Sequence, residues 1–233
     1  MFLVKTFCGI FSAMMNDLEF LDSVKVMPLM KLPVRSTIVN LNDAKILLSP
    51  GSALTKAQYQ NIRGVTDIVA TSLLHWAGVP LALSIFPNAR VWGHSKVQAA
   101  HEGVIWTHEL NENTWSHQAE LPTIEIKGIP KVGEFVFYHK KSKTLIVSDF
   151  AFNMTSVRGI GPLIILNLFG TYRRFAVSKF FLKFMEDRNA FEASLGEVFS
   201  YDFENLVVSH GDPVMGSAKD KLAAAFRERG FGI

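Results

Sequence analysis

Three short apolar runs of this 233-residue chain each lead to a side chain that could bind a metal ion or move a proton. The runs and the side chains that follow them are residues 67–71 (DIVAT) with His75, residues 144–148 (TLIVS) with Asp149, and residues 205–209 (NLVVS) with His210. Apolar runs of this length are typical of buried strands, and a rigid strand fixes the loop behind it. We therefore expect His75, Asp149 and His210 to lie at strand ends, where chemistry is usually placed.

Two histidines and one aspartate are a sufficient ligand set for one zinc, iron or manganese ion with an open coordination position. An ion in such a site lowers the pKa of water and so supports hydrolysis. A buried, unpaired carboxylate would be costly, so Asp149 needs a polar partner, and His210 is the natural candidate. The alternative is that the three side chains hydrogen-bond to the backbone or to one another and hold no metal.

Composition limits the class of protein and of partner. Hydrophobic residues make up 48% of the chain, including 19 Phe, so a large core can form. The 24 basic and 21 acidic residues leave a net charge of +3, which does not favour a nucleic-acid partner. Cys8 is the only cysteine, which excludes an internal disulfide and fits a reducing, cytoplasmic location. The unknown ligand is expected to be a small molecule.

The chain is expected to contain one domain behind a short leading segment. Residues 1–15 (MFLVKTFCGIFSAMM) are apolar, but Lys5 interrupts them, which is not the pattern of a signal peptide. We expect residues 1–23 to be a tail or docking segment and residues 24–233 to form a single domain. Residues 160–169 are the most apolar internal stretch, and they are too short to span a membrane.

The remaining pattern predicts a mixed domain of strands and helices. Further strands are expected over residues 24–29, 35–41, 45–51, 88–93, 120–129 and 134–139, and helices over residues 55–62, 81–86 and 220–229. Turn residues at 42–43 and 140–143 predict two hairpins. In residues 134–139, Phe135 and Phe137 alternate with Val136 and Tyr138, so the two pairs should face opposite sides of a sheet.

Residues 170–199 have helical spacing and carry an aromatic face. Phe175, Phe180, Phe181, Phe184 and Met185 fall on that face, which we expect to pack in the core. An apolar pocket wall, a homodimer interface through these helices and a contact with a membrane surface are the alternatives. Arg173, next to Arg174, is a candidate to bind a phosphate or carboxylate group of a substrate.

The order of these elements resembles the metallo-β-lactamase superfamily. Residues 46–51 (ILLSPG) resemble its early strand and D-P-G loop, with Ser49 in place of the acid, and residues 86–93 (FPNARVWG) resemble the segment after its metal motif. Residues 144–149 (TLIVSD) and 207–211 (VVSHG) resemble its strands that end in the bridging aspartate and the last histidine ligand. Residues 149–153 and 209–213 are similar to an uncharacterised branch of that superfamily.

The resemblance covers roughly residues 24–230 and implies a four-layer αββα sandwich, in which two mixed sheets are flanked by helices. It implies a hydrolase of esters, thioesters or phosphoesters, with a lid-like helical insertion at about residues 155–200. Asp149 and His210 would be catalytic, and together with His75 would hold the metal. Asp212 would orient His210 or form a turn, and Asn153 would contact substrate or cap a helix.

The metal motif departs from that family. Its signature is H-x-H-x-D-H after a strand and a threonine, whereas residues 71–78 of this chain are TSLLHWAG. If Thr71 is the family's threonine, every ligand position is replaced and His75 is one place out of register. If one residue is gapped, His75 takes the second histidine position, while Ala77 and Gly78 replace the aspartate–histidine pair. The family's middle histidine is also missing from the turn at residues 128–131 (GIPK).

A reduced site with one ion, or none, is therefore expected. Four further histidines are His94, His101, His108 and His117, and one of them could replace a missing ligand. Surface and helix-cap roles are the alternative for these four. If no metal binds, the protein would be a non-enzymatic member of the fold that binds a ligand or a partner.

Overall fold

The computed structural model describes residues 17–233. The predictions for residues 1–16, Cys8 among them, lie outside the described residues. The first strand, β1 (Leu18–Val26), begins inside the segment that the sequence assigned to a tail. Its register with β2 (Lys31–Asn40) runs without a break from Leu18 to Val26, so residues 18–23 belong to the sheet.

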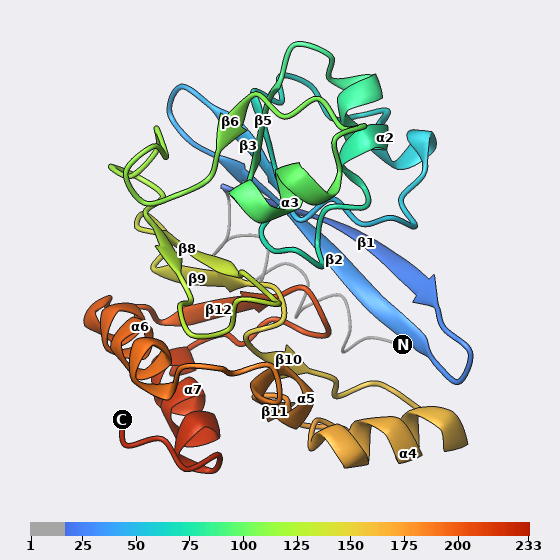
Figure 1. Ribbon diagram of the computed structural model, residues 1–233. Helices are drawn as coiled ribbons and strands as arrows, with labels where there is room; N and C mark the ends of the chain where they lie inside the picture. Colours follow the sequence, from blue (N-terminus) through green and yellow to red (C-terminus); the bar gives the residue numbers. More distant parts are fainter. Residues whose placement is uncertain (1–16) are drawn as a thin grey trace.

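Two sheets form the centre of the domain (Figure 1). The first sheet has six strands in chain order, namely β1, β2, β3 (Lys45–Leu48), β4 (Asp67–Val69), β5 (Arg90–Gly93) and β6 (His108–Glu109). The second sheet has the order β12 (Asn205–Val208), β9 (Thr144–Val147), β8 (Phe135–His139) and β7 (Thr123–Glu125). Each sheet is mixed. Strands β3 to β6 are parallel in the first sheet and β12 is parallel to β9 in the second, whereas the other neighbouring strands are antiparallel.

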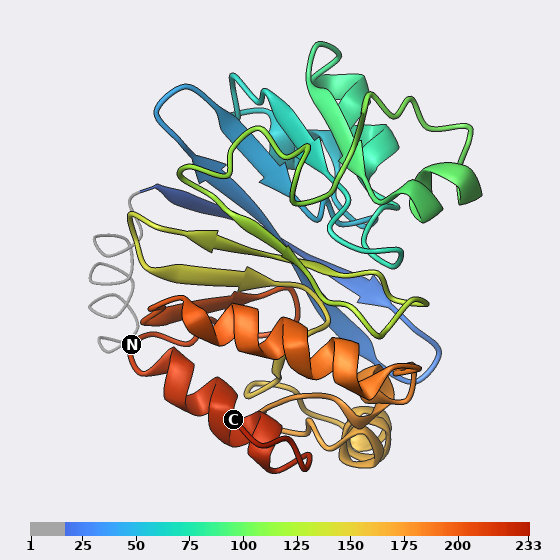
Figure 2. The same ribbon diagram turned by 60° about the vertical axis from the view of Figure 1, so that its left-hand side comes forward.

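The sheets pack face to face, and helices cover their two outer sides (Figures 1 and 2). Ile46 and Trp92 of the first sheet meet Phe137 and Val207 of the second in one buried cluster. The outer side of the first sheet packs against the 3-10 helix η1 (Lys56–Tyr59), α2 (Val79–Ile85) and α3 (Ser95–Ala100). The outer side of the second packs against α6 (Arg188–Ser200) and α7 (Ala218–Arg227). The predicted αββα sandwich is confirmed.

The predicted alternation of β8 is confirmed. Phe135 and Phe137 point into the cluster between the sheets, whereas Val136 and Tyr138 belong to the cluster under α6 and α7. Both predicted hairpins are also present, since β2 pairs with β3 and β8 pairs with β9 in antiparallel register. The strand is buried at every position because its sheet is covered on both sides, and the alternation of the pleat places the two pairs on opposite faces.

The predicted helical run over residues 170–199 is wrong in its first part. The preceding helix α4 (Ile160–Phe169) ends at Gly170, whose φ of +70° is left-handed. A short strand, β11 (Phe175–Ala176), then pairs with β10 (Phe152–Asn153). Helix α5 (Lys179–Leu182) begins only after Ser178, whose hydroxyl accepts the Phe180 N–H. The single aromatic face does not form, because Phe181 is buried whereas Phe180 is 45% exposed.

Within residues 17–233, no helix is both long enough and apolar enough to cross a bilayer. The apolar stretch that the sequence analysis singled out forms α4, a helix of ten residues. This agrees with the prediction that no segment there spans a membrane.

Asp67 fixes the start of β4 by a set of buried hydrogen bonds. Its carboxylate is fully buried and accepts hydrogen bonds from Arg90, Trp92 and Thr66, while His117 Nε2 lies 3.2 Å from Oδ2. Burial alone would raise the pKa of Asp67, but these four partners hold it far below its usual value. The carboxylate is therefore ionised and links β4 to β5, where Asp67 is opposite Arg90 in the register.

We predict that Asp67→Asn lowers the free energy of unfolding at neutral pH by about 2–4 kcal/mol. The neutral amide lacks the negative charge to which Arg90, Trp92 and Thr66 donate their hydrogen bonds. The pKa of Asp67 is lower in the folded protein than in the unfolded chain, where it is near 3.8. Its ionised form therefore stabilises the fold fully at pH values above 3.8, and this contribution is lost as the pH falls from there through the folded pKa. The difference between wild type and variant should shrink below about pH 3. Denaturant unfolding across pH measures it, with Asp43→Asn in an exposed turn as control. A difference that stays constant with pH would contradict this role.

Candidate functional site

The loops after β4, β9 and β12 bring His75, Asp149 and His210 together at one edge of the sandwich. His75 Nε2 lies 3.3 Å from Asp149 Oδ2, and His210 Nε2 lies 3.3 Å from Asp149 Oδ1. The side chains of His75, Asp149 and His210 are only 8%, 14% and 5% exposed, respectively. The three residues singled out in the sequence thus form one nearly dry cluster, which we call the His-Asp-His cluster.

Buried hydroxyl groups connect the strand ends that carry this cluster. Ser49 follows β3, Thr71 follows β4 and Ser148 follows β9, and each of the three hydroxyls lies within hydrogen-bonding distance of the other two. The His75 loop also approaches the end of β3 closely, because a Cβ on Gly78 would lie 2.2 Å from the Pro50 carbonyl oxygen. Only glycine allows that approach, so Gly78 helps to set the position of His75.

The orientation of His210 is fixed by two contacts. Its Nδ1 lies 2.8 Å from the Pro33 carbonyl oxygen in β2, and its ring stacks on Phe152 at a centroid distance of 5.1 Å. A carbonyl oxygen can only accept, so Nδ1 carries a proton that it donates to Pro33. In the neutral ring Nε2 is then an acceptor, and it faces Asp149 Oδ1, which is also an acceptor. A cation is needed between them, either a proton on His210 or a metal ion.

Asp149 shows the second feature that a bound cation would explain. Its Oδ2 is buried and accepts no hydrogen bond of good geometry from the described residues, although His75 Nε2 lies 3.3 Å away. Burial would raise the pKa of Asp149, but His75 and then His210 hold it well below its usual range. A buried carboxylate oxygen without a hydrogen bond is rare in proteins and calls for an explanation.

The cluster fits one metal ion. Each of the three residues offers one ligand atom, and these atoms all lie within 4.8 Å of one another. Two ligand atoms of a tetrahedral zinc ion lie about 3.4 Å apart, so the most distant pair of the cluster would have to move closer by up to about 1.4 Å. Two imidazoles and a carboxylate suit zinc, iron and manganese. The orphaned Asp149 Oδ2 and the facing acceptors are the two features that an ion there would explain.

Sequence reasoning missed Glu134, which supports the Asp149 loop. It is almost fully buried, and its carboxylate accepts the backbone N–H groups of Ser148, Asp149 and Phe150. Burial, with the negative charge of Asp149, raises the pKa of Glu134 to about 8, against the effect of these three hydrogen bonds. Its signal in the sequence was an acid directly before the apolar run FVFY.

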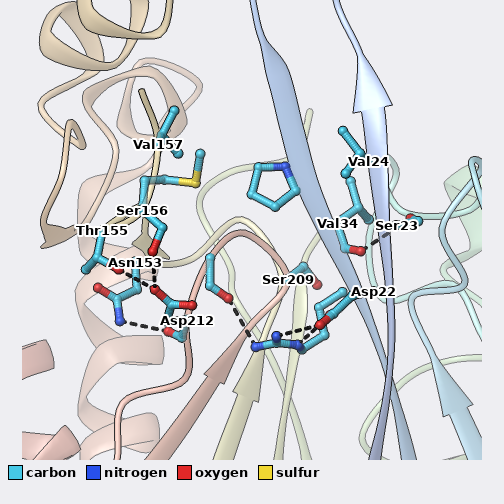
Figure 3. Close-up of a pocket in the computed structure, with 14 residues that line it drawn as sticks. Asp22, Ser23, Val24, Val34, Asn153, Thr155, Ser156, Val157, Ser209 and Asp212 are labelled. Carbon is cyan, nitrogen blue, oxygen red and sulfur yellow. Dashed lines mark hydrogen bonds and ion pairs between the residues drawn. The ribbon is translucent and has the colours of Figure 1, made fainter. Parts of the chain in front are cut away.

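Asn153 and Asp212 lie beside the cluster and line a pocket of about 270 Å³ (Figure 3). Asp212 accepts hydrogen bonds from the hydroxyls of Thr155 and Ser156, and Asn153 Nδ2 donates to the Asp212 carbonyl oxygen. Asp212 therefore does not orient His210, whose ring nitrogen goes to a backbone carbonyl in β2. Asn153 ties the last loop to β10 and caps no helix.

Arg173 is not part of the His-Asp-His cluster. It lies exposed in the turn between α4 and β11, with a left-handed φ of +51°, and it does not line the cavity beside the cluster. Its predicted contact with substrate has no support in this arrangement.

The four other histidines have structural contacts away from the His-Asp-His cluster. His94 caps α3 by accepting the Lys96 N–H, and His117 meets Asp67. His101 stacks on Trp76 and His108 stacks on Trp92. Among residues 17–233, none of the four belongs to a group that could hold a metal ion.

A cavity of about 420 Å³ opens on the cluster, and His75, Asp149 and His210 line part of it. Its other walls are largely apolar and come from the β1–β2 hairpin, α4 and α5, with Met30, Leu32, Ile165, Phe169 and Phe180 among them. Among the described residues of the wall, the charged side chains are Lys25 and Asp149, and two histidines accompany them. The predicted pocket wall thus comes from α4 and α5, whereas α6 packs on the outer side of the second sheet.

The comparisons with known proteins agree on the fold. The metallo-β-lactamase from Pontibacter korlensis superposes with a TM-score of 0.61 at 14% identity, covering 91% of this chain and 95% of that one. FIM-1 from Pseudomonas aeruginosa, in its mono-zinc form, gives 0.60 at 14% identity, with 92% of each chain covered. The enzyme from Erythrobacter litoralis gives 0.61 at 15% identity, covering 91% of this chain and 93% of that one. No family model and no curated protein matches the sequence.

The chain therefore has the metallo-β-lactamase fold, as the motifs and their order predicted. At these identities the similarity concerns the fold and leaves the chemistry to be argued from the residues themselves.

We predict that Glu134→Ala lowers the free energy of unfolding by about 3–5 kcal/mol, because three buried N–H groups lose their acceptor. Glu134→Gln should cost less, about 1–2 kcal/mol, since its amide oxygen can still accept the two bonds made by Oε1. The matched control is Glu109→Ala, on an exposed residue, which should change stability little. Equal stability of the Glu134→Ala and Glu109→Ala variants in denaturant unfolding would show that Glu134 does not support the loop.

Proposed function

We propose that this protein is a metal-dependent hydrolase with a single-ion site formed by His75, Asp149 and His210. The observation that carries the proposal is the pair of facing acceptors: His210 Nδ1 donates to Pro33, which leaves Nε2 against Asp149 Oδ1 at 3.3 Å. One metal ion in place of a proton satisfies both atoms and the orphaned Asp149 Oδ2. The mono-zinc form of FIM-1 is an example of this fold with one zinc.

The chemistry divides between the ion and the protein. A zinc, iron or manganese ion would lower the pKa of water and polarise a carbonyl or phosphoryl oxygen. The Pro33 carbonyl and Phe152 hold the His210 ring, so Nε2 keeps its direction towards the cluster. Asp149 is the only carboxylate among the described residues that line the cavity, and because its pKa is held low it would bind the ion as the anionic ligand.

The cavity favours an ester or thioester with an apolar group. Its volume of about 420 Å³ lies in the usual range for small-molecule sites, and most of its other lining residues are apolar. A substrate would place its scissile group there and its apolar part between α4 and the β1–β2 hairpin. A strongly anionic phosphoester is less favoured, because Lys25 is the only lysine or arginine among the described residues of the wall.

We predict that protein purified without chelator contains about one equivalent of zinc, iron or manganese per chain, or takes it up on soaking. His210→Ala and Asp149→Asn should reduce the content below about a tenth of an equivalent, because three ligands are the minimum set for such a site. Elemental analysis measures it. His108→Ala is the matched control, since His108 is exposed and stacks on Trp92 away from the cluster.

Wild-type protein that stays below about a tenth of an equivalent after soaking with each of the three metals would contradict the single-ion site. It would leave a protonated His-Asp-His cluster and favour a non-enzymatic, ligand-binding protein.

We further predict hydrolysis of p-nitrophenyl esters that is abolished by a chelator and restored by the metal found in the protein. Asp149→Asn should reduce kcat/KM by at least about a hundredfold, a usual loss for a proton-transfer group or metal ligand. Asp43→Asn, in an exposed turn, is the control variant. Activity that survives both the chelator and Asp149→Asn would exclude this site as its source.

A further inference from the structure

Exposed apolar side chains gather on one region of the molecule. Ten of the eleven large apolar residues that are exposed within residues 17–233 belong to the β1–β2 hairpin, to α4, to α5 or to the cavity wall. They are Val24, Val26, Met27 and Leu29 of the hairpin, Ile160, Leu163, Ile164 and Leu168 of α4, Phe180 of α5, and Leu74. The eleventh, Ile105, lies elsewhere. We call the ten residues the apolar patch.

The patch is continuous because α4 packs directly on the hairpin. A Cβ on Gly161 would lie 1.8 Å from the Leu29 carbonyl oxygen, so the start of α4 touches the hairpin tip. At the other end of the helix, Phe169 stacks on Phe180 of α5 at 4.8 Å. Both views show α4 beside the end of the β1–β2 hairpin (Figures 1 and 2). Met27, Leu74 and Phe180 also line the cavity, so the patch borders its opening.

Helix α4 is apolar around its circumference except at Asn167. Its sequence, IGPLIILNLF, contains no charged residue, and Leu166 is buried while Ile164 and Leu168 are exposed. A helix that is hydrophobic all round is normally covered, either by protein or by lipid. With ten residues it is too short to cross a bilayer, but it can lie in the interface.

The two segments that carry most of the patch contain charged residues of one sign only. Residues 24–34 and 155–185 contain no Asp or Glu, and they carry seven basic residues: Lys25, Lys31, Arg158, Arg173, Arg174, Lys179 and Lys183. Arg174 pairs with Glu228, and the other six form no ion pair within residues 17–233. An apolar surface with a basic rim is complementary to anionic lipid head groups. A second copy of the chain on the same surface would bring two basic rims together, which is unfavourable.

We propose that the apolar patch docks on an anionic lipid surface, with the cavity opening towards the lipid. An amphiphile from that surface would enter with its aliphatic chain along α4 and the hairpin and its polar group at the His-Asp-His cluster. Only this last step rests on the proposed hydrolase function. Docking itself needs no metal, so vesicle binding and metal content test the two proposals separately.

The test uses the full chain and flotation with vesicles of phosphatidylcholine, with and without phosphatidylglycerol. The protein should bind the anionic vesicles, and added salt should weaken binding. Leu168→Ser should weaken it about tenfold, because a buried leucine side chain is lost from the interface. Lys179→Gln should weaken binding to the anionic vesicles about fivefold.

Each variant has a matched control. Leu168 and Ile105 are 71% and 70% exposed, so Ile105→Ser removes an equally exposed side chain from outside the patch. Lys56→Gln removes an exposed lysine from η1. Both controls should bind like wild type. Residues 1–16 are the same in every variant, so their own affinity for lipid cancels in the comparison.

Three outcomes would overturn the proposal. The first is wild-type protein that does not float with anionic vesicles, and the second is Leu168→Ser protein that binds as well as Ile105→Ser. The third is a dimer in sedimentation velocity that Leu168→Ser dissociates, which would identify a second copy as the partner that covers the patch. Circular dichroism checks that each variant is folded.

Discussion

The negative charge of Asp149 is the constraint on which this end of the molecule depends. It sits among apolar layers where burial opposes ionisation, and His75 and His210 hold it in the charged form. Two histidines from two other strand ends must therefore reach the same point. That requirement fixes how the loops after β4 and β12 approach the loop after β9, because a buried unpaired carboxylate would cost several kcal/mol.

Backbone contacts, more than side chains, meet that requirement. The Asn153 N–H donates to the His210 carbonyl oxygen, and the loop turns through Gly211 at a left-handed φ of +112°. A Cβ on Gly211 would lie 2.0 Å from the Asn153 carbonyl oxygen, so only glycine allows the two segments to meet. The Asp149 loop is held by its backbone too, because three of its N–H groups donate hydrogen bonds to the Glu134 carboxylate. The cluster is thus held by groups that take no part in ligand binding.

The sequence predicted what depends on local pattern and order along the chain. The alternation in β8, the two hairpins and the three strand ends could be read from residue types, and the order of motifs predicted the layers. The Pro33 carbonyl that orients His210 carries no signal, because every residue has a carbonyl and the partner is 177 positions away. The helical pattern over residues 170–178 was misleading because a left-handed glycine and a two-residue strand pairing overrode the spacing. Long-range backbone contacts decided both cases.

The same two segments build both the cavity wall and the apolar patch, which connects the site to the surface. Residues 24–34 and 155–185 supply the apolar wall, and their outward side chains continue that wall across the outside of the molecule. The absence of any acid in these segments keeps Asp149 the only carboxylate in the cavity. Besides the His-Asp-His cluster and Lys25, the described wall offers only the hydroxyl groups of Ser52, Thr171 and Ser178. The proposed substrate would therefore place its reacting polar group at the cluster, where the charged side chains converge, and its apolar part towards α4.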